Sequence, residues 1–469
     1  MELLGGPGYP TPLHAMKYGP REEILYVTCC NPCPTKDRTD YLATIDVDPK
    51  SPTYCEIIHK TYTGWPKDIL HHSSWNACSS CHKCKHVTRD KLLMAGLESN
   101  RLYIIDTAKN PRAPEMHKII ERKEFDKLDC SFLHTGHCLP NGVVMISYCG
   151  DKDGNSKGNL LVLDAKTFEI KGEWFDKPYL DCHDYWYQPY HDVMITTEIG
   201  SPNLLKAGFS IDKIPSYGRS IHFHSWSTRE LLQSVDLGDD GIGTISACFM
   251  HNPKRSDGFV IGALSSNLTR FFKNDSGKWE TRKFISINPK KVSGWLMDTM
   301  PGLMSAIILS LDDKFLYMSN FLHGDVRQYD ISDLENPKLT GQVFLGGLIE
   351  SDSKIEVLED KDLTYRPDPV IIKGKRLYGG PHRLQLSLDG KRLYVTSELF
   401  QPWDRILYPE HHIHGGFLVK LDCDMENGGL TLDKDFYVDF TKDGEISLPH
   451  EIRYPGGDCS SDIWLADDK

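Results

Sequence analysis

The sequence lacks both long hydrophobic segments and clusters of basic residues. Its longest apolar run, around Leu303 to Leu311, is about half of the roughly 20 residues that a membrane-spanning helix requires. The first residues, MELLGGPGYPTPL, are interrupted by Gly and Pro and do not resemble a signal peptide. The net charge is -12, and no basic patch is present that could bind phosphates. We therefore expect neither a transmembrane segment nor a nucleic-acid partner.

Helical periodicity is also scarce. Almost every segment is typical of short strands separated by Gly, Asp, Asn and Pro turns. A unit of four strands recurs, and its clearest copies are SAIILSLDDKFLYMSN followed by VRQYDISD, and HRLQLSLDGKRLYVTS followed by GGFLVKLDCD. Repeats of this length and strand number are typical of propeller blades. The sequence therefore predicts an all-β fold of the β-propeller type.

The number of blades follows from counting the first strand of each repeat. Six such strands are predicted to begin near His72, His134, His183, Ala247, Ser305 and His382. The N-terminal strands EEILYVTC, DYLATIDVD and YCEIIHKTY lack a first strand, which LPHEIRYPGG could supply. We therefore predict a single domain over residues 1–469, a seven-bladed propeller closed by pairing of N- and C-terminal strands. Closure of this kind removes exposed sheet edges.

Two segments depart from the repeat, at about residues 198–220 and 348–375. We predict that they are loop insertions on one face. Long loops on a rigid β scaffold often carry function, and solvated decoration is the alternative.

Histidines recur at one register of the predicted first strands. Four blades carry a histidine six residues before the following turn, at His134, His183, His382 and His450, and the pair His71 and His72 falls beside the same position. First strands line the central channel, so these imidazoles should converge on the axis. Imidazole is a good ligand for copper and other late transition metals. We predict a metal site made of His71, His72, His134, His382 and His450, the alternative being a channel that is polar because it is wet.

The remaining blades leave space at this level. Ala247 and Ser305 occupy the register position there, which leaves room for a substrate. His137 lies three residues after His134, an odd offset that should point it to the other side unless Gly136 bends the strand.

Fourteen cysteines without a secretory signal are typical of reduced thiols in the cytosol. We expect a cytoplasmic protein, with the nucleus as a second location. In CSSCHKC, Cys78 and Cys81 have the CxxC spacing of zinc or thiol redox sites. The segment CCNPC could supply further ligands if the two loops meet, and free loop thiols are the alternative.

Several long motifs together resemble one family. SPTYCEIIHK, HHSSWNACSSC, FLHTGHC, YWYQP, NFLHGDVRQYDISD, LSLDGKRLYVTS and HEIRYPGGDCSSDIW, between about Pro7 and Trp464, are similar to the selenium-binding protein family, whose vertebrate and bacterial members are described as methanethiol oxidases. The resemblance implies copper-dependent oxidation of methanethiol by O2 and water to formaldehyde, hydrogen sulfide and hydrogen peroxide. It also implies that Cys55 is the cysteine associated with selenium. His183 and His382 depart from the family pattern, where Tyr and Gln can stand.

Roles for the remaining candidates follow from this chemistry. Oxidation of a thiol needs a proton acceptor, and His137 or His183 has a suitable intrinsic pKa. Cys55 is predicted to lie on the fourth, outermost strand of its blade, far from the axis, so selenium binding and copper chemistry would be separate. An inert, packed thiol is the alternative for Cys55.

Two other functions compete with the oxidase. One is a non-catalytic carrier or scaffold that binds selenium or thiols through Cys55. The other is a propeller hydrolase of the lactonase kind, which would place carboxylates and calcium at the axis; histidines at the register position disfavour it.

Overall fold

The computed structural model describes residues 6–179 and 181–466. Within these residues the chain forms thirty-three strands and five α-helices, and none of the helices is longer than seven residues. The all-β prediction is confirmed. None of the described helices is both long enough and apolar enough to cross a membrane.

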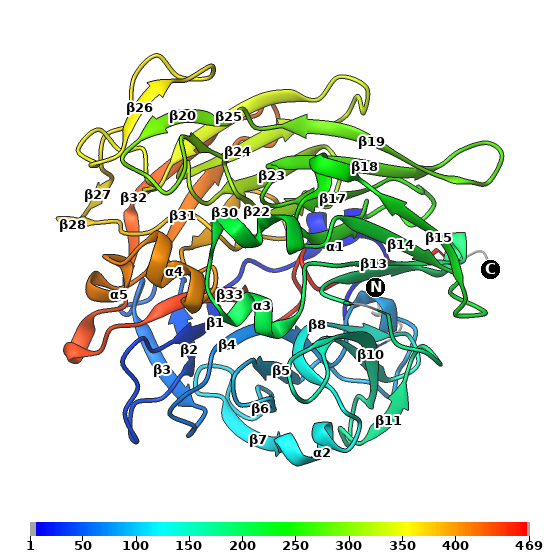
Figure 1. Ribbon diagram of the computed structural model, residues 1–469. Coiled ribbons are helices and arrows are strands. Elements are labelled where there is room, and N and C mark those ends of the chain that lie inside the picture. Colours follow the sequence, from blue (N-terminus) through cyan, green and yellow to red (C-terminus); the bar gives the residue numbers. More distant parts are fainter. Residues whose placement is uncertain (1–5, 180, 467–469) are drawn as a thin grey trace.

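Twenty-eight of these strands form seven four-stranded antiparallel sheets, which is consistent with a propeller (Figure 1). In spatial order, the strands of the first four sheets are β3 (Ile57–Tyr62), β2 (Tyr41–Asp46), β1 (Ile24–Cys30) and β33 (Leu448–Arg453); β7 (Glu115–Ile120), β6 (Arg101–Asp106), β5 (Lys91–Gly96) and β4 (Leu70–Trp75); β11 (Ile170–Glu173), β10 (Ser156–Asp164), β9 (Val143–Gly150) and β8 (Ser131–Leu139); and β15 (Leu231–Asp236), β14 (Ser220–His224), β13 (Val193–Thr197) and β12 (Tyr185–Gln188). Those of the other three are β19 (Trp279–Ser286), β18 (Asn267–Lys273), β17 (Gly258–Gly262) and β16 (Thr244–Phe249); β25 (Lys338–Phe344), β24 (Asp325–Asp330), β23 (Phe315–Asn320) and β22 (Met304–Leu309); and β32 (Leu430–Asp439), β31 (Phe417–Cys423), β30 (Arg392–Thr396) and β29 (Leu384–Leu386).

The remaining elements are short. Two small sheets contain β21 (Thr299–Met300), β20 (Lys290–Ser293) and β26 (Glu356–Glu359), and β27 (Ile371–Ile372) and β28 (Lys375–Arg376). The α-helices are α1 (Pro12–Tyr18), α2 (Arg122–Asp126), α3 (Pro202–Lys206), α4 (Gln401–Leu407) and α5 (His411–His414).

In each four-stranded sheet one end strand is more buried than the other. We call the strands at that end the inner strands; they are β33, β4, β8, β12, β16, β22 and β29. All six residues of β4 and of β33 are buried, whereas the outer strands β7 and β15 are largely exposed or half-buried. A strand buried along its whole length must be covered on both faces, so the inner strands lie deepest in the molecule. They begin where the sequence repeat predicted first strands.

The recurring SLD turn has a local physical cause. In both copies the serine hydroxyl donates to the aspartate two residues later, Ser310 to Asp312 at 2.5 Å and Ser387 to Asp389 at 2.7 Å. The same hydroxyls accept a backbone N–H from the residue that opens the next strand. Such side-chain bonds stabilise tight turns, which explains why the motif marks the end of a first strand.

The first sheet combines segments from distant parts of the chain. β33 pairs antiparallel with β1, with Tyr26 opposite Arg453 and Cys30 opposite Leu448. The segment LPHEIRYPGG therefore supplies the inner strand beside the N-terminal strands, as the sequence repeat predicted.

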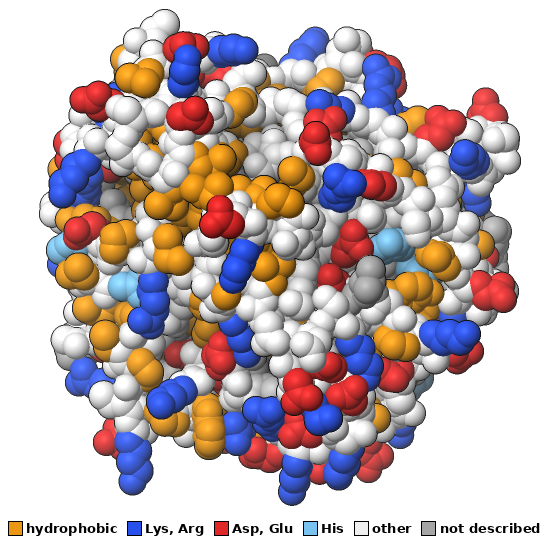
Figure 2. Space-filling model, viewed as in Figure 1, with side chains coloured by type: hydrophobic (Ala, Val, Ile, Leu, Met, Phe, Trp, Pro, Cys, Tyr) orange, Lys and Arg blue, Asp and Glu red, His pale blue; other side chains and the backbone are white. Residues whose placement is uncertain are grey.

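The two predicted insertions contain little regular structure. Residues 198–220 hold α3 and the 3₁₀ helix η3 (Ile211–Ser216), and residues 348–375 hold β26 and β27, with β26 pairing with β20. Helices α4 and α5, which lie between β30 and β31, were not predicted from the sequence. Helices α3 and α4 lie on the face seen in Figure 1, and Figure 2 shows hydrophobic side chains gathered on the upper left of that face.

Candidate metal centre

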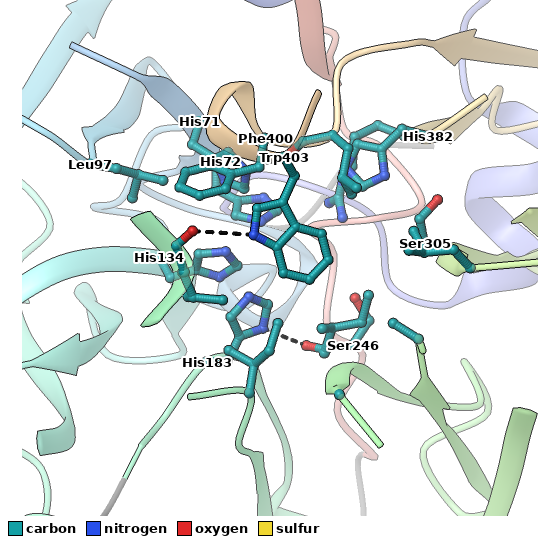
Figure 3. A pocket seen from close by; sticks show the side chains of 18 of the residues that line it. His71, His72, Leu97, His134, His183, Ser246, Ser305, His382, Phe400 and Trp403 are labelled. Carbon is teal, nitrogen blue, oxygen red and sulfur yellow. Dashed lines mark hydrogen bonds between the residues drawn. The ribbon is translucent and has the colours of Figure 1, made fainter. Parts of the chain in front are cut away.

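Six histidine rings form one cluster between the inner strands. We call His71, His72, His134, His183, His382 and His450 the histidine cluster, and Figure 3 shows the first five of them. The ring centroids of His71 and His450 are 3.8 Å apart, and those of His134 and His183 are 3.7 Å apart. His72 lies 4.0 Å from His134, and His382 lies 5.0 Å from His450. The predicted convergence of these side chains is therefore present in the structure.

Bulges in the inner strands direct the rings. The register of β4 against β5 shifts between Leu70 and Ser73, so the consecutive residues His71 and His72 can both join the cluster instead of pointing to opposite faces. β8 shifts between Leu133 and Gly136, around His134. A bulge re-aims a side chain at little cost to the sheet, and bulges are common beside active sites.

Bulges in two other inner strands change one predicted position. β16 shifts between Thr244 and Ala247, and β22 shifts between Met304 and Ala306. As a result Ser246, and not Ala247, lines the cavity beside the histidines, together with the predicted Ser305.

Most rings are held at one nitrogen by an outer group. Nδ1 of His450 lies 2.9 Å from the carbonyl oxygen of Glu398, and Nδ1 of His183 lies 2.8 Å from that of Ile245. Nδ1 of His72 lies 3.0 Å from a carboxylate oxygen of Glu451. Such partners fix the ring orientation and the tautomer, and metal-binding histidines almost always have them.

Other ring nitrogens face the cluster with no hydrogen-bond partner among the described residues. They are Nδ1 of His71, Nδ1 of His382 and Nε2 of His450. In the described part of the chain, His71, His72 and His450 are the one group of three potential ligands whose ligand atoms all lie within 4.8 Å of one another. A buried polar atom without a partner is costly, and a bound metal would satisfy it.

Burial keeps the imidazoles neutral. It holds the pKa of His71, His72, His134 and His382 well below the ordinary value, and the neighbouring histidines add to this effect. It also lowers the pKa of His183 to about 4 and that of His450 to about 3. Neutral imidazole is the form that binds metals. A nitrogen-only set of neutral ligands fits copper, and also zinc, iron or nickel.

An apolar cavity of about 80 Å³ adjoins the histidine cluster. Phe132, Phe400, Trp403 and Leu205 contribute to its wall, with Ser246 and Ser305 opposite the rings (Figure 3). The indole N–H of Trp403 on α4 donates to the carbonyl oxygen of Leu205 on α3 at 3.2 Å, which joins the two helices over the cavity. The sequence analysis missed Trp403 because the helix that carries it interrupts the strand repeat.

His137 lies outside the histidine cluster. It lines a second, more polar cavity, whose wall also includes His72, His134 and Asp184, and its ring packs edge-on against Trp186. Burial lowers the pKa of His137 to about 3. Of the two predicted proton acceptors, His183 therefore lines the apolar cavity and His137 does not.

A buried ion network behind His72 was not predicted. Glu451 contacts Arg383 and Arg453, and it accepts the backbone N–H of Ser73. Although burial opposes ionisation, the two guanidinium groups hold the pKa of Glu451 down to about 2. The position directly after His450 was the only signal for Glu451 in the sequence.

Cys55 lies away from the histidine cluster and lines neither of the two cavities. It does not lie on a strand, as predicted, but in the turn before β3, with a φ of 68°. Its Sγ faces the carbonyl oxygen of Asp435 at 3.9 Å. Burial raises the pKa of the thiol and outweighs the backbone of Tyr437 and the nearby lysines, which lower it, so Cys55 is not an activated thiol.

Cys78 and Cys81 are brought together with a residue that the sequence analysis did not assign to them. The Sγ atoms of Cys78 and Cys138 are 2.6 Å apart, and Cys81 hydrogen-bonds to Cys138. Cys78 directly precedes the 3₁₀ helix η1 (Ser79–Cys81), which follows β4, whereas Cys138 lies on β8. Spacing along the sequence could not reveal this pairing because it depends on how two sheets meet.

Comparison with known proteins gives consistent matches over the whole chain. Residues 3–465 match the family described as 56 kDa selenium binding protein. The chain is 50% identical over 467 residues to a human protein named methanethiol oxidase and to selenium-binding protein 2 of Mus musculus, with 98% of each chain covered. The X-ray structure of a hypothetical selenium-binding protein from Sulfolobus tokodaii superposes with a TM-score of 0.86 at 36% identity, over 97% of this chain and 98% of the other.

Proposed function

The chain belongs to the 56 kDa selenium-binding protein family, and from this premise we propose that it is a methanethiol oxidase that uses copper held by the histidine cluster. The proposed reaction consumes methanethiol, O2 and water and releases formaldehyde, hydrogen sulfide and hydrogen peroxide. The observation that carries the proposal is the position of a set of neutral, buried imidazoles beside a small apolar cavity.

We propose that His71, His72 and His450 bind the copper, with His134 and His382 completing or adjusting the ligand set. Copper when bound would supply a soft acceptor for a thiolate sulfur and a redox couple for electron transfer to O2. The outer partners of these rings would keep the free ring nitrogens aimed at the metal, which raises affinity by reducing the disorder that binding must remove.

The apolar cavity would bind the methyl group and exclude bulk water. His183 is held at Nδ1 by Ile245, which leaves Nε2 as the proposed acceptor of the substrate thiol proton; burial lowers the pKa of the ring to about 4, so it is a weaker base than an ordinary histidine. His137 would accept or release protons only on the side of the second cavity. We keep Cys55 as the proposed attachment point for selenium, separate from this chemistry.

We also propose that the seven sheets are the blades of one closed propeller. The pairing of β33 with β1 supports closure, and inner strands adjacent along the chain contact one another, as β4 does with β8 and β16 with β22. For its location we propose the cytosol, with the nucleus as a second site, because all fourteen cysteines are free thiols, as a reducing compartment would keep them.

Copper loading tests the proposed function directly. The purified full-length chain, stripped with a chelator and reloaded, is expected to bind close to one tightly held copper ion per chain. Its electron paramagnetic resonance spectrum should show nitrogen hyperfine structure because the ligands are imidazoles. O2-dependent sulfide release from methanethiol should require the metal. Equal activity in the stripped and reloaded protein would refute the proposal.

Replacing Cys55 by alanine should leave copper content and sulfide release within about twofold of the unmodified protein. The thiol lies outside both cavities, and its removal deletes only a small buried group. Metal analysis and a sulfide electrode measure the two quantities. If copper binding disappears with Cys55 and survives changes in the histidine cluster, a selenium or thiol carrier replaces the oxidase.

The size of the cavity predicts a preference for very small thiols. A buried cavity of about 150 Å³ can hold benzene, and the cavity beside the histidines is about 80 Å³. Replacing Trp403 by leucine should enlarge it and raise kcat/KM for propanethiol relative to methanethiol by about tenfold, since each methylene in an apolar pocket contributes about 1–3 kcal/mol. Trp65→Leu, at a side chain outside the cavity, is the matched control. An unchanged ratio in Trp403→Leu would show that this wall does not select the substrate.

A further inference from the structure

Three thiols gather beside the inner strands β4 and β8. The hydroxyl of Ser80 lies 3.2 Å from Sγ of Cys78, 3.4 Å from Sγ of Cys138 and 3.9 Å from Sγ of Cys81. All three cysteines are buried, with exposed fractions of 1% or less. They share no member with the histidine cluster, and none of them lines either cavity. We call Cys78, Cys81 and Cys138 the thiol cluster.

The geometry favours a disulfide over a metal site. The Sγ atoms of Cys78 and Cys138 are 2.6 Å apart, slightly more than the roughly 2.05 Å of an S–S bond. A thiolate metal site needs three or four sulfurs around one point. In the part of the chain that the structure describes, the thiol cluster does not form a group whose ligand atoms all lie within 4.8 Å of one another.

One thiol of the cluster is activated. A hydrogen bond from Cys138, opposed by burial, lowers the pKa of Cys81 to about 7. The thiolate is the form of cysteine that reacts with peroxides. In contrast, burial raises the pKa of Cys138 well above its ordinary value. The buried guanidinium of Arg89, which is paired with Asp462, adds a positive charge that interacts with Cys78.

The segment next to the thiol cluster is partly exposed to solvent, and therefore to small oxidants. The segment that follows η1, residues 82–90, is half-buried or exposed. Cys84, three residues after Cys81, is itself half-buried and contacts the carbonyl oxygen of Pro140 at 2.5 Å. The chain therefore becomes partly exposed directly after the buried Cys81.

From this arrangement we propose that Cys78, Cys81 and Cys138 form a peroxide-sensitive redox site that closes to a Cys78–Cys138 disulfide. The Cys81 thiolate attacks one oxygen of hydrogen peroxide, so that the O–O bond breaks, hydroxide leaves and Cys81 becomes a sulfenic acid. Cys138 attacks that sulfur, forming the Cys81–Cys138 bond and releasing water. Cys78 then loses its proton to the released hydroxide, which becomes the second water, and attacks Sγ of Cys138; the disulfide moves to Cys78–Cys138 and Cys81 leaves as a thiolate.

The sum of these steps is two thiols and one peroxide giving one disulfide and two waters. The product would join η1, which follows the strand carrying His71 and His72, to β8, which carries His134. The proposal does not depend on the oxidase activity, because peroxide from any source serves. The proposed reaction would nevertheless release peroxide in the same molecule.

The test uses the full chain, reduced and stripped of metal, so that failure of the oxidase proposal cannot affect it. One equivalent of hydrogen peroxide is added, remaining thiols are alkylated under denaturing conditions, and the digest is read by mass spectrometry. A cross-linked peptide pair containing Cys78 and Cys138 is expected, and a reductant should remove it. Recovery of both residues fully alkylated would overturn the proposal, as would pairing that is random among the fourteen cysteines.

Two variants separate the roles within the cluster. Cys81→Ser should slow disulfide formation by about tenfold or more, because it removes the thiol whose pKa is lowered. Cys138→Ser should leave Cys78 free to alkylate after peroxide. The matched control is Cys149→Ser on β9, a buried thiol whose pKa burial raises, and it should not change the rate. If Cys138→Ser fails to fold, the cross-linked peptides of the unmodified chain still test whether the Cys78–Cys138 disulfide forms. Zinc-dependent protection of all three thiols from both peroxide and alkylation would assign the cluster to a metal instead.

Discussion

Replacing His450 by alanine is expected to lower bound copper from close to one ion to below about a tenth of an ion per chain, and sulfide release by about 100-fold or more. His450 is fully buried, and its Nε2 has no partner among the described residues. Loss of an outer partner alone typically costs 10- to 100-fold in metal affinity, so loss of a ligand should cost at least about as much. Metal analysis and oxygen-dependent sulfide release should fall together.

Controls distinguish lost coordination from lost folding. His450→Gln keeps most of the side-chain volume but removes the ring nitrogen donor, so it should lose copper while unfolding at nearly the same temperature. His414→Ala removes a histidine that is 43% exposed and lies outside the cluster, and it should change neither quantity. A His450→Ala protein that is folded and retains a full equivalent of copper would show that the ion lies elsewhere.

Replacing Glu22 by alanine is expected to lower the free energy of unfolding by about 3–5 kcal/mol. Glu22 precedes β1 and forms two hydrogen bonds with Arg392 on β30, at 2.6 and 2.9 Å, while Tyr394 donates to the same carboxylate. The Glu22 and Arg392 side chains are only 1% and 8% exposed. Removing Glu22 leaves the buried guanidinium of Arg392 poorly compensated, because its other carboxylate partner, Asp389, is itself 36% exposed, and breaking a buried ion pair in this way typically costs about 3–5 kcal/mol. Guanidinium unfolding followed by tryptophan fluorescence measures it.

The double variant Glu22→Ala with Arg392→Met tests whether the unpaired charge causes the loss of stability. If the uncompensated charge causes the loss, removing both partners should restore much of the stability, because apolar side chains often replace a buried pair at little cost. Glu124→Ala, at an exposed pair with Lys127, should have no measurable effect. An equal loss in the single and double variants would assign the effect to packing instead.

The sequence allowed prediction of those features that depend on local chemistry. The SLD turns and the strand lengths between them are local, so they revealed the four-stranded repeat and the inner strands. Counting six residues back from those turns identified His134, His183, His382 and His450, and the structure places all four in the histidine cluster. The identity of the metal and the role of each histidine stay predictions.

Features that depend on contacts between sheets could not be predicted. The bulge at His71 and His72 brings two adjacent rings to one side, which strict alternation along a strand would forbid. Trp403 lies on a helix inserted into a strand repeat, and Cys138 meets Cys78 only because β8 packs beside η1. Each of these positions is set by tertiary packing, which the local sequence pattern does not determine.

The placement of β33 also orders events during translation. Glu451 is synthesised 379 residues after its partner His72, which corresponds to about 20–80 s at about 5–20 residues per second on the ribosome. Until β33 emerges, β1 presents an unpaired edge, and the histidine cluster lacks His450. A nascent or prematurely terminated chain would therefore be open to chaperones and proteases and would lack one of the proposed metal ligands. The histidine cluster is thus complete only after β33 has been synthesised and has paired with β1, so the site and the fold are completed together.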